Sequence, residues 1–350
     1  MDNLKDASVS EKTPLLNHRS LSFQSQVSST VLDGDDDVQV DPPERSALEK
    51  HITLVHATGI IIGTVCGTGI FISPTGVTRS VESVGMSLVL WAAGGIFSLV
   101  LALCYAEIGS VMPVSGGDYA YIQRILGQIP AFVCLWATLL LLSSACALMA
   151  RSAALYLLQM FNMQCHMFPL FNLTYQLRLL YLTVAFAYLN CRTSKWSAKI
   201  LNIFSLGKIV AMIIIIISGV VSLVQNGYVQ TDSAFANTNW SVSSMCVGFV
   251  ASFITFAGWD SVTAIAGEMK NPKRDLPIAL MSSLIIVTAI YIFINAAYFS
   301  VLTVDEFLSS DAVAVTFAVN ALPKVPWLVP LMVCIAAAGS INATYLIAPR

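Results

Sequence analysis

Long apolar runs separated by short polar stretches make up the chain from about residue 53 onward. A helix needs about 17 or more mostly apolar residues to cross a bilayer, and eight runs reach that length. Backbone N–H and C=O groups in lipid must be bonded within a helix or a closed barrel, and the runs lack the alternating pattern of barrel strands. The pattern therefore predicts an all-α polytopic membrane protein with spans at 53–73, 84–108, 131–157, 175–191, 200–224, 244–267, 277–299 and 326–348.

The first 50 residues have a different composition, rich in Ser, Asp and Glu and poor in aromatic residues. Such a segment cannot bury enough apolar surface to fold. We therefore expect residues 1–50 to form a disordered tail and residues 51–350 to form one transmembrane domain. Within the tail, residues 11–16 (EKTPLL) are similar to an acidic dileucine sorting signal, a pattern short enough to arise by chance.

Charge supports the membrane prediction and adds an orientation. Only 11% of the residues are charged, whereas a soluble domain carries charge on roughly a quarter of its residues. The net charge of −2 gives no basic surface for nucleic acid. Lys and Arg favour cytoplasmic loops, and a cytoplasmic N-terminus places seven of them inside and two outside. The inside set is Arg124, Arg192, Lys195, Lys199, Lys270, Lys273 and Arg274, and the outside set is Arg79 and Lys324.

Glycines mark an unusual place in the first span. Gly59, Gly63 and Gly67 recur every fourth residue, which is typical of a stripe that packs closely against another helix. Alternatively, Gly67-Thr68-Gly69 interrupts the helix, because two glycines within three residues weaken it. A half-helix starting after the interruption would direct its positive end at an anion. The residues alone leave both interpretations open.

The sixth span has a second candidate interruption, at residues 257–261, where Gly258 lies close to Asp260. A carboxylate at membrane depth is costly, so Asp260 should face a cavity or a partner. The alternative is a helix-packing glycine with Asp260 paired to a neighbour. Interruptions in spans one and six are five spans apart, as expected if two five-helix repeats each begin with a broken helix.

Few residues suggest other chemistry. The eight cysteines include no CxxC pair, and no catalytic or metal-binding motif is present, so we expect no enzyme, cofactor or metal. A channel would be built from a repeated pore helix or a ring of like groups, and paired interruptions argue against it. Cys165 lies in the outer loop between spans three and four, where an unpaired cysteine suggests an intermolecular disulfide. Cys246 is its one intramolecular rival, and a free thiol is the other alternative.

Four segments together resemble a known family: residues 62–77 (IGTVCGTGIFISPTGV), 105–107 (YAE), 115–121 (SGGDYAY) and 258–276 (GWDSVTAIAGEMKNPKRDL). The chain resembles the light chains of heteromeric amino acid transporters, the L-type family of the amino acid–polyamine–organocation superfamily. The resemblance implies a LeuT-like inverted-repeat fold of twelve helices, of which about eight are present here, and sodium-independent amino acid exchange by alternating access. It also implies that Cys165 links the chain to a single-spanning glycoprotein heavy chain.

The resemblance also implies a substrate site built mostly from backbone. In this family the substrate carboxylate meets N–H groups of the first broken helix, here Thr68 and Gly69, and the amino group meets carbonyls of both broken helices. Many relatives place an aromatic gate where this chain has Ile254, so the gate here is smaller or rebuilt from a neighbour. The expected substrate-binding residues are Val65, Gly67, Thr68, Gly69, Ile254, Thr255, Ala257 and Gly258.

Two further expectations concern the role of Lys208 and the length of the chain. The resemblance implies that the Lys208 ammonium replaces the cation of sodium-coupled relatives, while the alternative is a lysine that snorkels to the membrane interface. Because four helices of the family fold are missing, a non-transporting, truncated membrane partner is the alternative function. We expect residence in the plasma membrane, with an endosomal or lysosomal compartment as the alternative.

Overall fold

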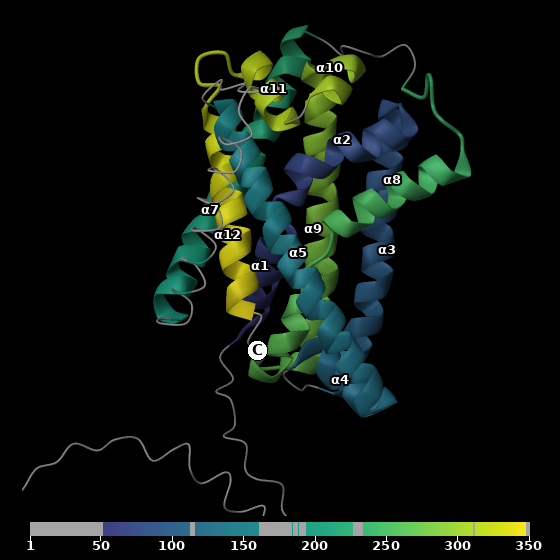
Figure 1. Ribbon diagram of the computed structural model, residues 1–350, viewed down its shortest axis with the longest axis vertical. Helices are drawn as coiled ribbons and strands as arrows, with labels where there is room; N and C mark the ends of the chain where they lie inside the picture. Colours follow the sequence, from purple (N-terminus) through teal and green to yellow (C-terminus); the bar gives the residue numbers. More distant parts are fainter. Residues whose placement is uncertain are drawn as a thin grey trace, which may run out of the picture. The chain divides into compact units, whose positions relative to one another are not determined.

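The computed structural model describes residues 52–112, 116–160, 184, 188, 194–226, 234–310 and 312–347. These residues form helices and one isolated parallel bridge, between Ile52 and Met269. The predicted all-α class is therefore confirmed. The predicted tail lies outside the described residues and stays a prediction. The helices, shown in Figure 1, are α1 (Leu54–Val65), α2 (Gly69–Val81), α3 (Val84–Val111), α4 (Gly117–Leu126), α5 (Gln128–Met160), α7 (Ser194–Asn226), α8 (Val242–Thr255), η1 (Trp259–Glu268), α9 (Pro272–Val301), α10 (Val304–Ser309), α11 (Val313–Ala321) and α12 (Leu328–Ile347).

Among the described residues, six helical spans are long and apolar enough to cross a membrane, and the bent pair α1 and α2 makes a seventh. Seven of the eight predicted spans correspond to these helices, and the protein is a multi-pass membrane protein. The predicted span at 175–191 lies almost wholly outside the described residues. The first span is longer than predicted, because α2 continues through Pro74 to Val81. Pro74 removes one helical hydrogen bond, but it is buried together with Val77 and Val81, and this packing holds the helix together.

The long helix α9 is the central packing element of the described helices. It starts at Pro272, and the missing N–H of this proline costs nothing at the first helical position because that N–H would have no partner within the helix. Asp275 lies in the first turn, where its negative charge interacts favourably with the positive end of the helix dipole. Figure 1 shows α9 running between α3 and α7, and it packs against both of these helices and against α1. Its thirty residues rise about 45 Å, enough to cross a bilayer core of about 30 Å.

Two spans are interrupted. The axes of α1 and α2 differ by 52° across the break after Val65. The sixth span starts as the α-helix α8 and continues after Gly258 as the 3₁₀-helix η1, which is ten residues long. Runs of 3₁₀-helix longer than about four residues are uncommon and often mark a functional hinge. The interruptions predicted from glycine are therefore present, and α1 packs against η1 while α2 packs against α8.

Candidate functional site

The break in the first span leaves backbone donors unpaired. Near it, the N–H of Gly67 donates to the carbonyl of Val65 at 2.6 Å, in a tight turn. The next three N–H groups, of Thr68, Gly69 and Ile70, make no backbone hydrogen bond to any described residue. Unpaired N–H groups at the start of a helix, together with the helix dipole, form an anion-binding site. The predicted positions of the carboxylate site, Thr68 and Gly69, therefore carry the unpaired donors.

The break in the sixth span leaves acceptors unpaired. Gly258 has φ 111°, a left-handed conformation that favours glycine, and it ends the path of α8. Just before it, the carbonyls of Phe256 and Ala257 accept no hydrogen bond within the described part of the chain. The carbonyl of Ile254, by contrast, accepts from the N–H of Ala257 at 3.1 Å. Ala257 is therefore better placed than Ile254 to receive an ammonium group.

Direct contacts hold the two breaks together. The Thr64 hydroxyl donates to the carbonyl of Gly258 at 3.1 Å, and Ser261 Oγ donates to Thr64 Oγ1 at 3.2 Å. A Cβ atom added at Gly69 would lie 2.8 Å from Cγ2 of Thr255, closer than real Cβ contacts. Glycine at position 69 thus lets the start of α2 approach the end of α8, so the unpaired donors and acceptors are neighbours.

Tyr291 on α9 bonds to both broken spans. Its buried hydroxyl donates to the carbonyl of Val65 at 2.8 Å and lies 3.4 Å from the carbonyl of Thr255. Its ring packs against Phe256, with centroids 4.9 Å apart, and against Trp91, with centroids 5.6 Å apart. Tyr291 could not be predicted from the sequence, because a tyrosine within an apolar span resembles any other packing residue until its partners are known.

Lys208 lies in the core and does not snorkel. Its side chain is 1% exposed, and its Nζ donates to Ser340 Oγ at 2.9 Å and to the carbonyl of Gly63 at 3.3 Å. It therefore ties α7 to α12 and to α1, less than one turn before the break. A buried ammonium with these oxygen partners supplies a fixed positive charge beside the interrupted helix.

The residues around the expected gate point elsewhere. The Ile254 side chain is 63% exposed, so it does not pack closely over the two helix breaks. Phe256 is buried against Trp91 and Tyr291. Phe253 stacks on Phe249 and meets Phe97 edge to face. Both neighbouring phenylalanines are therefore committed to packing, and neither replaces an aromatic gate at position 254 in this conformation.

The remaining predicted site residue, Cys165, lies outside the described residues. Its intramolecular rival Cys246 is a free, exposed cysteine on α8. Within the described ranges, no three His, Cys, Asp or Glu side chains gather as metal ligands would. The described site thus consists of unpaired main-chain donors and acceptors on two helix ends, a geometry suited to a small molecule with one negative and one positive group.

The chain matches the family model described as "Amino acid permease" over residues 52–350. It is 34% identical over 315 residues to the human "b(0,+)-type amino acid transporter 1", covering 89% of this chain and 64% of that protein. It is 35% identical to the human "Large neutral amino acids transporter small subunit 2", covering 87% and 57% of the two chains. It is 36% identical to the human "Cystine/glutamate transporter", covering 86% and 60%. The chain thus spans less than two thirds of the length of these relatives.

Proposed function

Since the chain belongs to the amino acid permease family, we propose that it is the light chain of an amino acid transporter that exchanges one amino acid for another across the membrane. The observation that carries this proposal is the set of unpaired N–H groups at Thr68, Gly69 and Ile70, close to the unpaired carbonyls of Phe256 and Ala257. An amino acid is a zwitterion whose carboxylate and ammonium groups fit these two sets.

Main-chain binding explains how one site can serve several amino acids. The α-carboxylate is held at the start of α2, where the helix dipole favours a negative charge. The α-ammonium is held by carbonyls at the end of α8, with Ala257 contributing the free acceptor nearest Gly258. Because both groups are common to all amino acids, the side chain of the substrate is read by the surrounding pocket.

Sodium independence is part of the proposal and rests on Lys208. Sodium-coupled transporters use a bound cation to hold the broken helix in shape. Here the Lys208 ammonium donates to the carbonyl of Gly63 on α1 and to Ser340 on α12. A tethered ammonium in this position takes the place of an exchangeable cation, so transport needs no sodium gradient.

The proposal also includes the orientation of the chain in the membrane and its assembly with a partner. We propose a cytoplasmic N-terminus, residence in the plasma membrane, and a disulfide from Cys165 to a single-spanning heavy chain. In this orientation α4 and the Ile52–Met269 bridge lie near the cytoplasmic side, and α10 and α11 lie outside. The two interrupted spans then present the site alternately to each side.

The decisive test is uptake of radiolabelled amino acids into proteoliposomes that contain the purified chain, with and without a co-purified heavy chain. We expect uptake only when unlabelled amino acid is present inside, and equal uptake in sodium and choline buffers. Uptake that ignores internal amino acid indicates a channel and contradicts exchange. Absence of any flux with the heavy chain present indicates a non-transporting membrane partner.

A further inference from the structure

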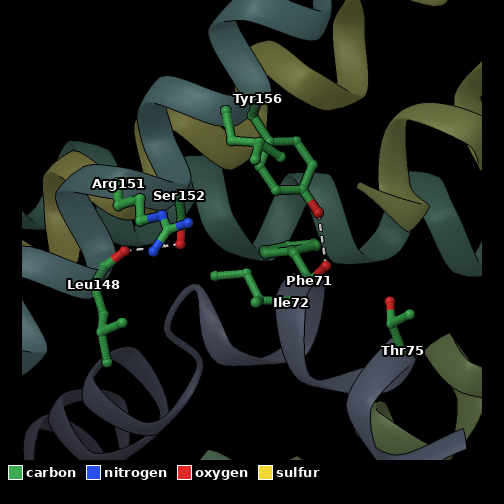
Figure 2. Close-up of a pocket in the computed structure, with 8 residues that line it drawn as sticks. Phe71, Ile72, Thr75, Leu148, Arg151, Ser152 and Tyr156 are labelled. Atoms are coloured by element: carbon green, nitrogen blue, oxygen red, sulfur yellow. Dashed lines mark hydrogen bonds between the residues drawn. The ribbon is translucent and has the colours of Figure 1, made fainter. Parts of the chain in front are cut away.

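Tyr156 on α5 joins three helices through one hydroxyl group. Its side chain is buried, and the hydroxyl donates to the carbonyl of Phe71 on α2 at 2.6 Å, the bond drawn between these two residues in Figure 2. The backbone N–H of Ala314 on α11 donates to the same oxygen atom. A phenol hydroxyl both donates and accepts hydrogen bonds, so the two bonds can form together. Tyr156 therefore links α5 to α2 and to α11.

The two partners of Tyr156 lie in the first turns of their helices. Helix α11 begins at Val313, so the N–H of Ala314 has no acceptor within its own helix. A buried N–H without a partner is costly, and the bond to the Tyr156 oxygen removes this cost. Phe71 lies two residues after Gly69, where α2 begins. One hydroxyl thus connects the start of α11 with the start of α2.

The helices α10 and α11, residues 304–321, form a pair that packs on α2 at the end of the bundle that is uppermost in Figure 1. Helix α11 also packs against α5. A second bond holds this α10–α11 pair, because Arg79 in the last turn of α2 donates from Nη2 to the carbonyl of Leu308 at 3.0 Å. The pair is therefore fastened to α2 near both ends of this helix, through Tyr156 at its start and through Arg79 at its end.

The start of α2 is also where the proposed carboxylate site lies. The unpaired N–H groups there belong to Thr68, Gly69 and Ile70, and Phe71 is the next residue. Helical residues rise about 1.5 Å each, so these four residues span only about 5 Å of the helix axis. A bond that fixes this first turn also fixes the directions of its N–H groups. Donors that are held in place before the ligand arrives raise its affinity, because they need not be ordered on binding.

We infer that Tyr156 is a positioning residue for the substrate carboxylate, and that it makes the carboxylate site depend on the packing of the α10–α11 pair. This inference rests on the proposed function, because it takes the carboxylate to be bound at the start of α2. When the pair packs on α2, the Ala314 N–H and the Phe71 carbonyl hold the Tyr156 hydroxyl in one orientation. Because linkage is reciprocal, a bound carboxylate in turn stabilises the packed pair.

Two buried tyrosines provide a matched pair of variants. Tyr156→Phe removes the bonded hydroxyl and keeps the ring. Tyr298 on α9 is also buried, and its ring packs against Phe307 and Phe317 of the α10–α11 pair. Its hydroxyl has no partner among the described residues, so Tyr298→Phe makes the same chemical change without breaking a hydrogen bond.

The test measures how strongly the purified full chain in nanodiscs prefers an amino acid over its α-amide, by titrating the ligand-induced thermal shift. The probes are L-leucine, L-arginine and L-glutamate, each compared with its α-amide, which keeps the side chain and the ammonium group but lacks the carboxylate charge. We expect Tyr156→Phe to reduce the parent's preference for the carboxylate about 2- to 10-fold, the range for one hydrogen bond. Tyr298→Phe should keep the preference.

The outcomes separate the inference from the proposed function. If Tyr156→Phe lowers thermal stability but keeps the preference, the hydroxyl only holds helices together, and the inference is wrong while the proposed function stands. Equal losses of preference in Tyr156→Phe and Tyr298→Phe also overturn the inference, because the bond to Phe71 is then not the cause. Equal binding of acid and amide by the parent removes the carboxylate from the start of α2 and overturns the inference. Failure of all three amino acids to bind the parent overturns the proposed function as well.

Variants outside α5 test the link to the α10–α11 pair and cover a folding failure of Tyr156→Phe. Ala314→Pro removes the N–H that donates to Tyr156, and the first turn of a helix tolerates proline. Arg79→Gln removes the bond to Leu308 at the other end of α2. We expect each to reduce the preference for the carboxylate about 2- to 10-fold, with no further loss in a Tyr156→Phe chain. An unchanged preference in both variants, or losses that add to that of Tyr156→Phe, overturns the inference.

Discussion

At the scale of single residues, Gly69 is the glycine at which the start of α2 approaches Thr255 on α8. We expect Gly69→Leu to abolish amino acid binding, because its Cβ would lie 2.8 Å from Thr255 and its side chain would fill the site. Thr68→Val should have a mild effect, below about 1 kcal/mol, since the backbone N–H remains and only a neutral hydroxyl is lost. Binding is measured as the thermal shift induced by amino acids.

Gly59→Leu is the control for this substitution. Gly59 also lies on the first span, but a Cβ added there has no neighbour within 4 Å. We expect this variant to bind amino acids as the parent does. Normal binding by Gly69→Leu, or an equal loss in both variants, would show that the carboxylate is held elsewhere.

Asp118 on α4 provides a prediction about pH. Burial raises the pKa of its carboxyl above the ordinary value, and a hydrogen bond from Tyr105 partly opposes this. One of its carboxylate oxygens is buried without a partner among the described residues. A carboxyl with a raised pKa binds its proton more tightly in the folded state, so its contribution to stability falls as pH rises through this window. Asp118→Asn should therefore raise the thermal midpoint at pH 7.5, with a smaller gain near pH 4.

The pH prediction is checked by thermal unfolding of parent and variant in the same detergent at each pH. Asp305→Asn serves as the control, because Asp305 is an exposed carboxylate in the first turn of α10. We expect no gain in its midpoint at pH 7.5. If Asp118→Asn lowers the midpoint at pH 7.5, the ionised Asp118 has a stabilising partner and the prediction is wrong.

At the scale of elements, local sequence predicted where seven of the described spans lie and marked two glycine positions as candidate breaks. The length of an apolar run and the spacing of glycines are properties of the local sequence, so both can be recognised without knowing the fold. The sequence did not predict that α2 continues past Pro74, because that depends on burial of Pro74, Val77 and Val81. It also missed Tyr291, whose partners Val65 and Thr255 lie 226 and 36 residues away.

The bridge between Ile52 and Met269 gives a prediction for the elements α1 and η1. The N–H of Ile52 donates to the carbonyl of Glu268 at 3.1 Å, and the N–H of Lys270 donates to the carbonyl of Ile52 at 3.1 Å. Proline has no N–H, so Ile52→Pro removes the first of these bonds. We expect it to lower the free energy of unfolding by about 1–3 kcal/mol and to slow exchange.

The matched control is Ile52→Val, which keeps both backbone bonds and most of the buried side chain. Unfolding in denaturant and exchange in proteoliposomes are measured for both variants. We expect Ile52→Val to lose about 0.5–1.5 kcal/mol, the usual cost of this substitution in a core, and to exchange at the parent rate. Equal exchange rates in the proline and valine variants would show that the bridge has no part in transport.

At the scale of the whole molecule, the family match confirms the resemblance drawn from the four sequence motifs. The proposed main-chain site is consistent with the glycine-rich motifs of the family, since glycine allows the backbone conformations that leave N–H and C=O groups unpaired. If the site binds substrate through the main chain, the motifs do not specify the substrate, because the groups that bind an amino acid backbone are the same for every side chain.

Assembly with a heavy chain is tested through Cys165. Co-expression with a candidate heavy chain should give a high-mass band on a non-reducing gel, and Cys165→Ser should remove it while leaving exchange within about twofold. Cys246→Ser is the control, since Cys246 is the exposed rival on α8, and it should keep the band. An identical band pattern in the parent and in Cys165→Ser would rule out this disulfide.

The contacts of α1 and η1 have a mechanical consequence. These half-helices are fastened to each other at both ends, by Thr64 and Gly258 at the breaks and by Ile52 and Met269 at the far end. Two helices that are connected at both ends move together as one rigid body. A force applied to the chain just before Ile52 would therefore act on both interruptions at once, so that a protein bound to the N-terminal segment could change the geometry of the proposed substrate site.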